Sequence, residues 1–101
     1  IDVVPLTADG RIDLDAAEAM ISEEHRLVGF AHVSNVLGSI VDAPRAAEIA
    51  HSKGALLLLD GCQAAPRTSV NVREQSADFY TYSGHKLYGP TGIGILWGRS
   101  E

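Results

Sequence analysis

Apolar side chains recur at helical spacing in two stretches of the chain. The first stretch follows Asp13 or Asp15, either of which can cap a helix that runs to about Ser22. The second follows Asp42 and ends before Gly54, a residue type that favours helix C-termini. The pattern therefore predicts two amphipathic helices.

Four short stretches have the composition of β-strands. A continuous apolar run, residues 55–60, is typical of a parallel strand that is buried on both faces. The strands are expected over residues 27–34, 55–60, 78–83 and 93–97. Alternation of strands and helices predicts an α/β fold with a mostly parallel sheet. Only eight residues separate Ser83 from Gly92, too few for a helical crossover, so the final strand is expected to be antiparallel.

Polar residues follow the predicted strands at three places, namely residues 34–35, 60–63 and 83–86. In open α/β sheets, ligands bind beyond the carboxyl ends of parallel strands. Asp60 follows four leucines, and no Lys or Arg lies within six residues of it. An unpaired carboxylate at a buried strand end is costly, so Asp60 is either a loop anchor or a partner for a bound positive charge.

Lys86 is one of only two lysines in the chain, and it lies between two apolar strands. In a protected pocket, a lysine with a lowered pKa can act as an imine-forming nucleophile, although a solvated loop lysine is the commoner case. Ser83, Gly84 and His85 precede it and offer a hydroxyl, flexible backbone and an imidazole to a phosphate group.

Other motifs are incomplete. Residues 89–94 lack the GxGxxG spacing of a dinucleotide-binding loop and instead favour a tight turn. Residues 82–84 lack the first glycine of a hydrolase nucleophile elbow. The four histidines form no close ligand pair, and Cys62 is the only cysteine, so we expect no metal site.

Composition narrows the classes of function. The chain has 101 residues, enough for one domain, with 13 acidic and 8 basic side chains and a net charge of −5, which disfavours nucleic acid as a partner. Its longest apolar run, residues 55–59, is too short to span a bilayer, and no basic-then-apolar leader begins the sequence. A single cysteine fits a reducing compartment, so a cytoplasmic location is expected.

Three segments together resemble the SUF-type cysteine desulfurases, which belong to the class V aminotransferases of fold type I: HVSNVLG at 32–38, DGCQA at 60–64 and DFYTYSGHKLYGPTGIG at 78–94. The resemblance implies a seven-stranded sheet with an antiparallel last strand. It places residues 1–101 in the large domain that binds pyridoxal 5′-phosphate, with an N-terminal segment and a small C-terminal domain absent. Residues 1–101 alone are then expected to be inactive.

The resemblance also implies a role for each polar residue. Lys86 would bind the cofactor as an imine, and Asp60 would pair with the protonated pyridine nitrogen, so that the ring can accept electrons. Gln63 would hydrogen-bond the phenolic oxygen of the ring. Ser83 and His85 would hold the phosphate.

The implied substrate is L-cysteine, with L-selenocysteine as a second candidate, and Asn35 would reach the substrate carboxylate or the ring hydroxyl. The whole enzyme would be a homodimer that passes persulfide sulfur to an acceptor protein for iron–sulfur cluster assembly. Cys62 stands where relatives often have Ala, so it is not expected to carry the persulfide. A kynureninase-like lyase, an epimerase, a transaminase or a non-catalytic remnant of the fold are the alternatives.

Overall fold

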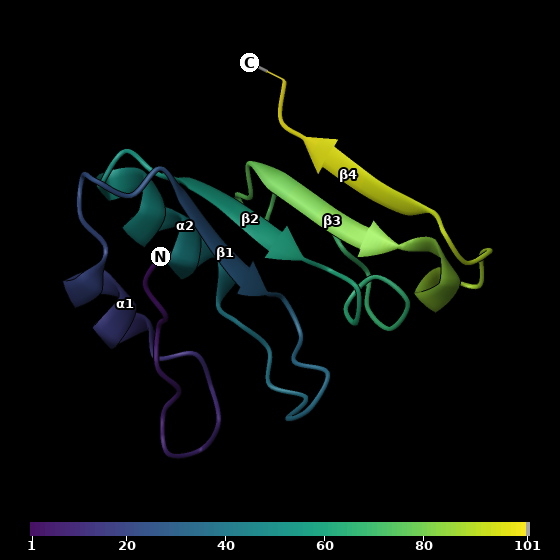
Figure 1. The fold of residues 1–101 in the computed structure, drawn as a ribbon, viewed down its shortest axis with the longest axis horizontal. Helices are drawn as coiled ribbons and strands as arrows, with labels where there is room; N and C mark the ends of the chain where they lie inside the picture. Colours follow the sequence, from purple (N-terminus) through teal and green to yellow (C-terminus); the bar gives the residue numbers. More distant parts are fainter. Residues whose placement is uncertain (101) are drawn as a thin grey trace.

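A four-stranded mixed sheet forms the centre of the structure, a computed structural model that describes residues 1–100 (Figure 1). Its strands, in the order β1-β2-β3-β4, are β1 (Leu27–Ala31), β2 (Leu56–Asp60), β3 (Phe79–Ser83) and β4 (Gly94–Gly98). The pairs β1–β2 and β2–β3 are parallel, and β3–β4 is antiparallel. The predicted α/β class and the antiparallel last strand are therefore confirmed.

Both predicted helices are present as α1 (Leu14–Met20) and α2 (Ala43–Ser52). Asp13, not Asp15, caps α1, because its carboxylate accepts a hydrogen bond from the backbone N–H of Ala16 at 2.9 Å. The helix ends at Met20, two residues earlier than predicted. Asp42 caps α2 in the same way, and Gly54 adopts a φ of 76° just beyond its end.

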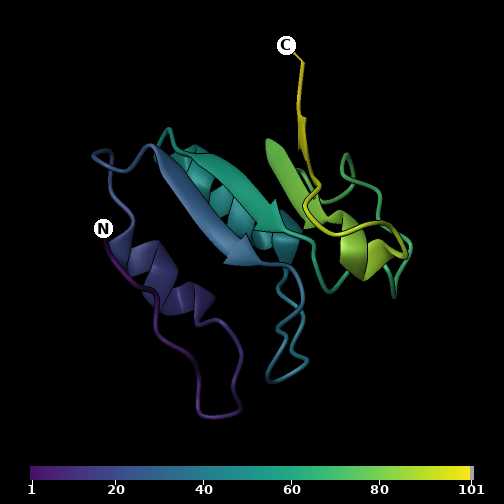
Figure 2. The same ribbon diagram turned by 45° about the vertical axis from the view of Figure 1, so that its right-hand side comes forward.

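The core lies between the helices and one face of the sheet. Leu57 and Leu59 on β2 are completely buried, and α2 packs against this strand. Val28 and Tyr80 join the same cluster from the neighbouring strands. Figure 2 shows β1 and β2 nearly face-on while β4 is seen on edge, so the sheet twists strongly across its four strands.

The opposite face of the sheet is open in the described residues. Leu27, Leu56 and Leu96 are 54%, 44% and 65% exposed. The prediction that residues 55–60 are buried on both faces is therefore wrong for residues 1–100, because the two helices share one core cluster on the other face. An open face leaves the strand ends accessible from one side.

Strand β1 ends at Ala31, three residues earlier than predicted. The chain turns away at this point because Val33 forms an antiparallel bridge with Ile40. The first residue after the strand still keeps its pairing, since the backbone N–H of His32 donates to the carbonyl oxygen of Asp60 at 2.9 Å. Asn35 therefore lies in the loop between β1 and α2, and not on a strand.

The connection from β3 to β4 is a short helical turn, η1 (Gly84–Leu87), followed by a tight glycine-rich loop. The backbone N–H of Gly84 donates to the carbonyl oxygen of Ile93 at 2.9 Å, which closes the loop. A Cβ at Gly84 would lie 2.5 Å from Cγ2 of Ile93, so no larger residue fits there without a shift.

Among residues 1–100, no helix is both long and apolar enough to cross a membrane.

Candidate functional site

Polar side chains gather where β2 and β3 end. Asp60 is the last residue of β2 and Ser83 the last residue of β3. Asp60 is paired with Thr81, and paired residues on neighbouring strands project to the same face of a sheet. Ser83 follows Thr81 by two residues and therefore shares that face. The predicted juxtaposition of these two strand ends is present on the open face.

Cys62 links the two strand ends. Its backbone N–H donates to Oδ1 of Asp60 at 2.9 Å, and its Sγ lies 3.6 Å from Oγ of Ser83. Asp60 is exposed and has no ion-pair partner within residues 1–100. The expectation that its carboxylate emerges in a buried, low-dielectric environment is wrong for the described chain, because neither helix covers the open face. The charge of Asp60 remains free for a ligand.

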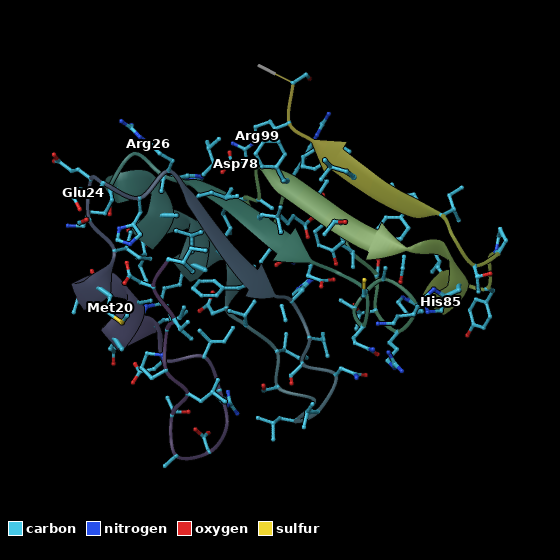
Figure 3. All side chains as sticks on the ribbon, viewed as in Figure 1. Met20, Glu24, Arg26, Asp78, His85 and Arg99 are labelled. Carbon is cyan, nitrogen blue, oxygen red and sulfur yellow. The ribbon has the colours of Figure 1, made fainter. Side chains whose placement is uncertain are left out.

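His85 and Lys86 lie on η1, immediately after Ser83. Figure 3 shows His85 near the carboxyl end of β3, at the opposite end of that strand from Asp78 and Arg99. Both η1 side chains are exposed, and neither has a hydrogen-bond or ion-pair partner in the part of the chain that the structure describes. The protected pocket predicted around Lys86 is therefore not formed by residues 1–100, although the backbone places both groups beside Ser83.

Asn35 and Gln63 meet beside these strand ends. Nε2 of Gln63 donates to Oδ1 of Asn35 at 2.6 Å, so the structure brings together two predicted site residues that are 28 positions apart. Arg67 completes this contact by donating to the side-chain oxygen of Gln63. Arg67 was not among the predicted site residues, although its spacing of four residues from Gln63 is that of neighbours on a helical turn.

A buried His–Tyr pair lies on the core side of the strand ends. Nδ1 of His32 shares a hydrogen bond of 2.9 Å with Oη of Tyr80, and the rings meet edge to face at 89° with centroids 5.8 Å apart. Burial lowers the pKa of His32. Burial, with smaller contributions from Asp60 and Cys62, raises the pKa of Tyr80 to about 12. Both rings are therefore neutral at neutral pH. The two residues lie 48 positions apart, so no local sequence pattern could predict their contact.

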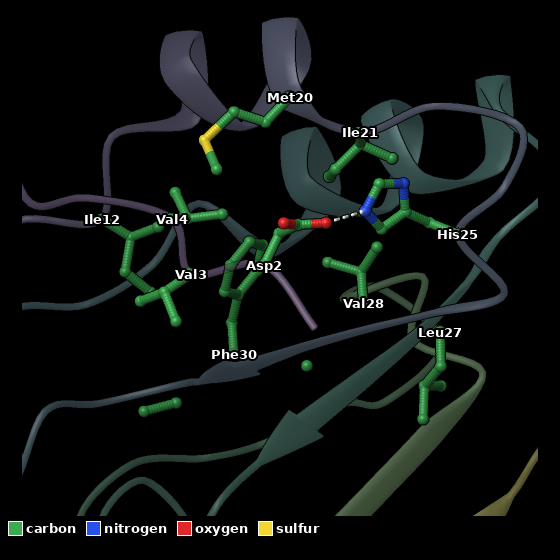
Figure 4. Close-up of a pocket in the computed structure, with 12 residues that line it drawn as sticks. Asp2, Val3, Val4, Ile12, Met20, Ile21, His25, Leu27, Val28 and Phe30 are labelled. Carbon is green, nitrogen blue, oxygen red and sulfur yellow. Dashed lines mark hydrogen bonds and ion pairs between the residues drawn. The ribbon is translucent and has the colours of Figure 1, made fainter.

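A separate hollow of about 360 Å³ lies between the N-terminal segment and β1 (Figure 4). Its lining is mostly apolar, and its polar contact is the 3.0 Å pair between Nε2 of His25 and Oδ2 of Asp2. None of the six predicted site residues lines it. The hollow is therefore distinct from the candidate site.

The donor set at the strand ends fits pyridoxal phosphate chemically. Within the described residues, the Asp60 carboxylate accepts a hydrogen bond from the backbone N–H of Cys62 at Oδ1 alone. Its Oδ2 can therefore face a cationic pyridine nitrogen. Lys86 offers a primary amine, the group that condenses with an aldehyde. Ser83 and His85 offer a hydroxyl and an imidazole for a phosphate, next to the narrow backbone turn that Gly84 permits.

Two curated proteins with similar sequences are described as cysteine desulfurases. A probable cysteine desulfurase from Halobacterium salinarum is 48% identical over 99 residues, which are 98% of this chain and 24% of that protein. A cysteine desulfurase from Dickeya dadantii is 46% identical over 99 residues, with the same two coverages of 98% and 24%. The chain thus spans about a quarter of the length of these curated relatives.

Among solved structures, the cysteine desulfurase CsdA from Escherichia coli matches with a TM-score of 0.89 and 42% sequence identity, over 95% of this chain and 24% of that one. The family model described as aminotransferase class V matches residues 1–101. Agreement of sequence, fold and donor set over this length shows that the chain belongs to the class V aminotransferases, a family that depends on pyridoxal phosphate.

Proposed function

We propose that residues 1–101 form part of the large, cofactor-binding domain of a pyridoxal-phosphate-dependent cysteine desulfurase. One observation carries this proposal: Cys62 ties Asp60 to Ser83, directly before the turn that bears Lys86. An acid, a phosphate-binding hydroxyl and an amine thus lie at one end of the sheet. Relatives named cysteine desulfurase favour this activity over other reactions of the family.

Each side chain has a defined task in this proposal. Lys86 would hold the cofactor through its amine, and the same amine would supply a base near the reacting carbon. Asp60 keeps the pyridine nitrogen protonated. Ser83 and His85 bind the phosphate, and Gln63 hydrogen-bonds the phenolic oxygen. When bound, the cofactor withdraws electrons from the substrate α-carbon.

Asn35 contacts the substrate carboxylate or the ring hydroxyl in this proposal, and L-cysteine is the substrate. The carbon–sulfur bond of L-cysteine breaks and sulfur is inserted into an enzyme thiol, so that cysteine plus a thiol gives L-alanine plus a persulfide. The accepting thiol is not Cys62, whose sulfur lies against Ser83 rather than on a free loop. L-Selenocysteine would give L-alanine in the same way.

We further propose the assembly, the location and the sulfur acceptor of the whole enzyme. The whole enzyme is a homodimer, it is cytoplasmic, and it passes persulfide sulfur to an acceptor protein for iron–sulfur cluster assembly. Light scattering of the full-length protein tests the dimer. Transfer of labelled sulfur from cysteine to a scaffold protein tests the last step.

The deciding experiment incubates the full-length protein with L-cysteine and a reductant and measures L-alanine and sulfide together. We expect equal amounts of the two products, and no products from Lys86→Ala. Lys53→Ala is the matched control, because this second lysine lies at the end of α2, and it should retain full activity. Borohydride should fix the cofactor on Lys86 only.

Other outcomes identify the alternatives. Transfer of the amino group to a keto acid would indicate a transaminase, cleavage of kynurenine a lyase, and inversion of an amino acid an epimerase. Absence of any cofactor adduct in the wild-type protein would indicate a non-catalytic relative. Each of these results contradicts the proposed desulfurase.

A further inference from the structure

Arg67 is a cationic side chain that lies beside the proposed cofactor-binding residues without being one of them. Backbone hydrogen bonds from the N–H of Ala65 to the carbonyl oxygen of Gly61, 2.8 Å, and from that of Thr68 to Ala64, 2.9 Å, wind the segment after β2 into helical turns. Arg67 therefore lies one turn beyond Gln63. Its Nη1 donates both to the backbone oxygen of Gln63, at 3.1 Å, and to the side-chain Oε1.

Arg67 decides which way the Gln63 amide faces. A guanidinium has donors only, so the atom of Gln63 that faces it has to be the oxygen. The amide nitrogen then faces Asn35 and donates to its Oδ1 at 2.6 Å. Asn35 in turn presents its own nitrogen away from Gln63.

A Gln–Asn pair without such a neighbour has two equivalent arrangements. Rotating both amides by half a turn exchanges oxygen and nitrogen in each and restores a hydrogen bond of opposite direction. The cation of Arg67 favours one arrangement, because the other would turn an amide N–H₂ toward the guanidinium. One exposed arginine thereby fixes the direction of two amides.

We propose that Arg67 is a positioning residue that sets the hydrogen-bond direction of the Gln63–Asn35 pair at the cofactor site. This inference rests on the proposed function, in which Gln63 donates to the phenolic oxygen of pyridoxal phosphate. The Gln63 amide nitrogen carries two hydrogens. One is donated to Asn35, and the other remains for the phenolic oxygen. The simpler role of Arg67, a brace of the helical turn through the backbone oxygen of Gln63, would affect stability and leave the cofactor unaffected.

The test uses the full-length holoenzyme and follows the absorption of the bound cofactor as a function of pH. A donor to the phenolic oxygen stabilises its ionised form, so losing the donor moves the spectral midpoint to higher pH. We expect Arg67→Gln, whose amide can offer either an oxygen or a nitrogen, to raise the midpoint by roughly 0.5 pH unit. Arg67→Ala should do the same, which keeps the test independent of one variant's folding.

Arg67→Lys retains a donor-only cation and should restore the wild-type midpoint. In a Gln63→Ala background, Arg67→Gln should cause no further shift, because the amide through which it acts is gone. Unchanged midpoints in Arg67→Gln and Arg67→Ala would overturn the inference. A lowered melting temperature in all Arg67 variants, with the wild-type midpoint, would leave only the bracing role.

The titration needs bound cofactor and no turnover of cysteine. A wild-type enzyme that binds the cofactor but leaves L-cysteine intact would therefore refute the proposed function, while the Arg67 comparison would still decide this inference.

Discussion

The Tyr80 ring occupies the space that a side chain at position 61 would need. A Cβ built on Gly61 would lie 2.1 Å from Cε1 and 2.2 Å from Oη of Tyr80. Tyr80 cannot move aside easily, because it is 2% exposed and its hydroxyl is tied to His32. The glycine after Asp60 is thus required by packing beneath the site.

Gly61→Ala should therefore destabilise the full-length protein by about 1–3 kcal/mol, the usual cost of overpacking a core. Gly29→Ala is the matched control, because a Cβ at Gly29 on β1 would have no heavy atom within 4 Å. Denaturant melts of the two variants against wild type measure the difference. Equal stability of Gly61→Ala and wild type would show that the Tyr80 ring moves aside without cost.

Asp60→Asn should separate cofactor binding from cofactor activation. Asparagine can still accept the hydrogen bond from the backbone N–H of Cys62, but it cannot neutralise a pyridinium. We expect nearly full cofactor occupancy and a rate lower by about two to three orders of magnitude, corresponding to roughly 3–4 kcal/mol. Occupancy from absorbance and turnover with L-cysteine, measured on one preparation, check this. Near-normal turnover at full occupancy would make Asp60 a loop anchor.

Cys62→Ala should retain most of the desulfurase activity. The hydrogen bond from position 62 to Asp60 comes from the backbone and survives the substitution, while the side chain loses only a 3.6 Å sulfur contact to Ser83. Alanine formation by this variant and by Lys86→Ala provides the comparison. A loss as deep as that of Lys86→Ala would place the Cys62 thiol in the chemistry.

Asp78 should stabilise the fold at neutral pH and lose part of this effect in acid. Its Oδ2 accepts hydrogen bonds from the backbone N–H of Leu57 at 2.8 Å and from Nε2 of His51 at 2.7 Å. Burial alone would raise the pKa of Asp78, but these bonds and nearby Arg99 hold it below its ordinary value of 3.8. Asp78→Ala should cost about 1–3 kcal/mol at pH 7, since it leaves the amide of Leu57 without its partner.

The sign of the pH effect follows from this lowered pKa. The folded state holds the Asp78 proton more weakly than the unfolded state, so the contribution is complete above the ordinary pKa and disappears as pH falls through the folded pKa. The difference in melting temperature between wild type and Asp78→Ala should shrink as the pH falls below about 4, and the part that remains in acid is the hydrogen bond that protonated Asp78 still accepts from Leu57. Glu48→Ala, an exposed acid on α2, is the control that should match wild type throughout. A pH-independent gap would contradict the assigned ionisation.

Local sequence signals were enough for the two α-helices, the four strands and the strand directions, but not for η1. The eight-residue link before Gly92 excluded a helical crossover, and β4 is antiparallel as expected. The end of β1 was missed because Val33 pairs with Ile40, a contact that β-propensity does not encode. The rule that ligands bind beyond the carboxyl ends of parallel strands located Asp60 and Ser83. The position of Arg67 depends instead on where a helical turn begins after β2, which that rule does not predict.

The leucines on the open face of the sheet have a consequence for work with shortened proteins. Leu27, Leu56 and Leu96 present apolar surface to water, and β1 and β4 are edge strands with free backbone groups in the four-stranded sheet. Such surfaces pair with copies of themselves. A polypeptide limited to residues 1–101 should therefore aggregate as its concentration rises, and Leu56→Lys together with Leu96→Lys should keep it dispersed in light-scattering measurements.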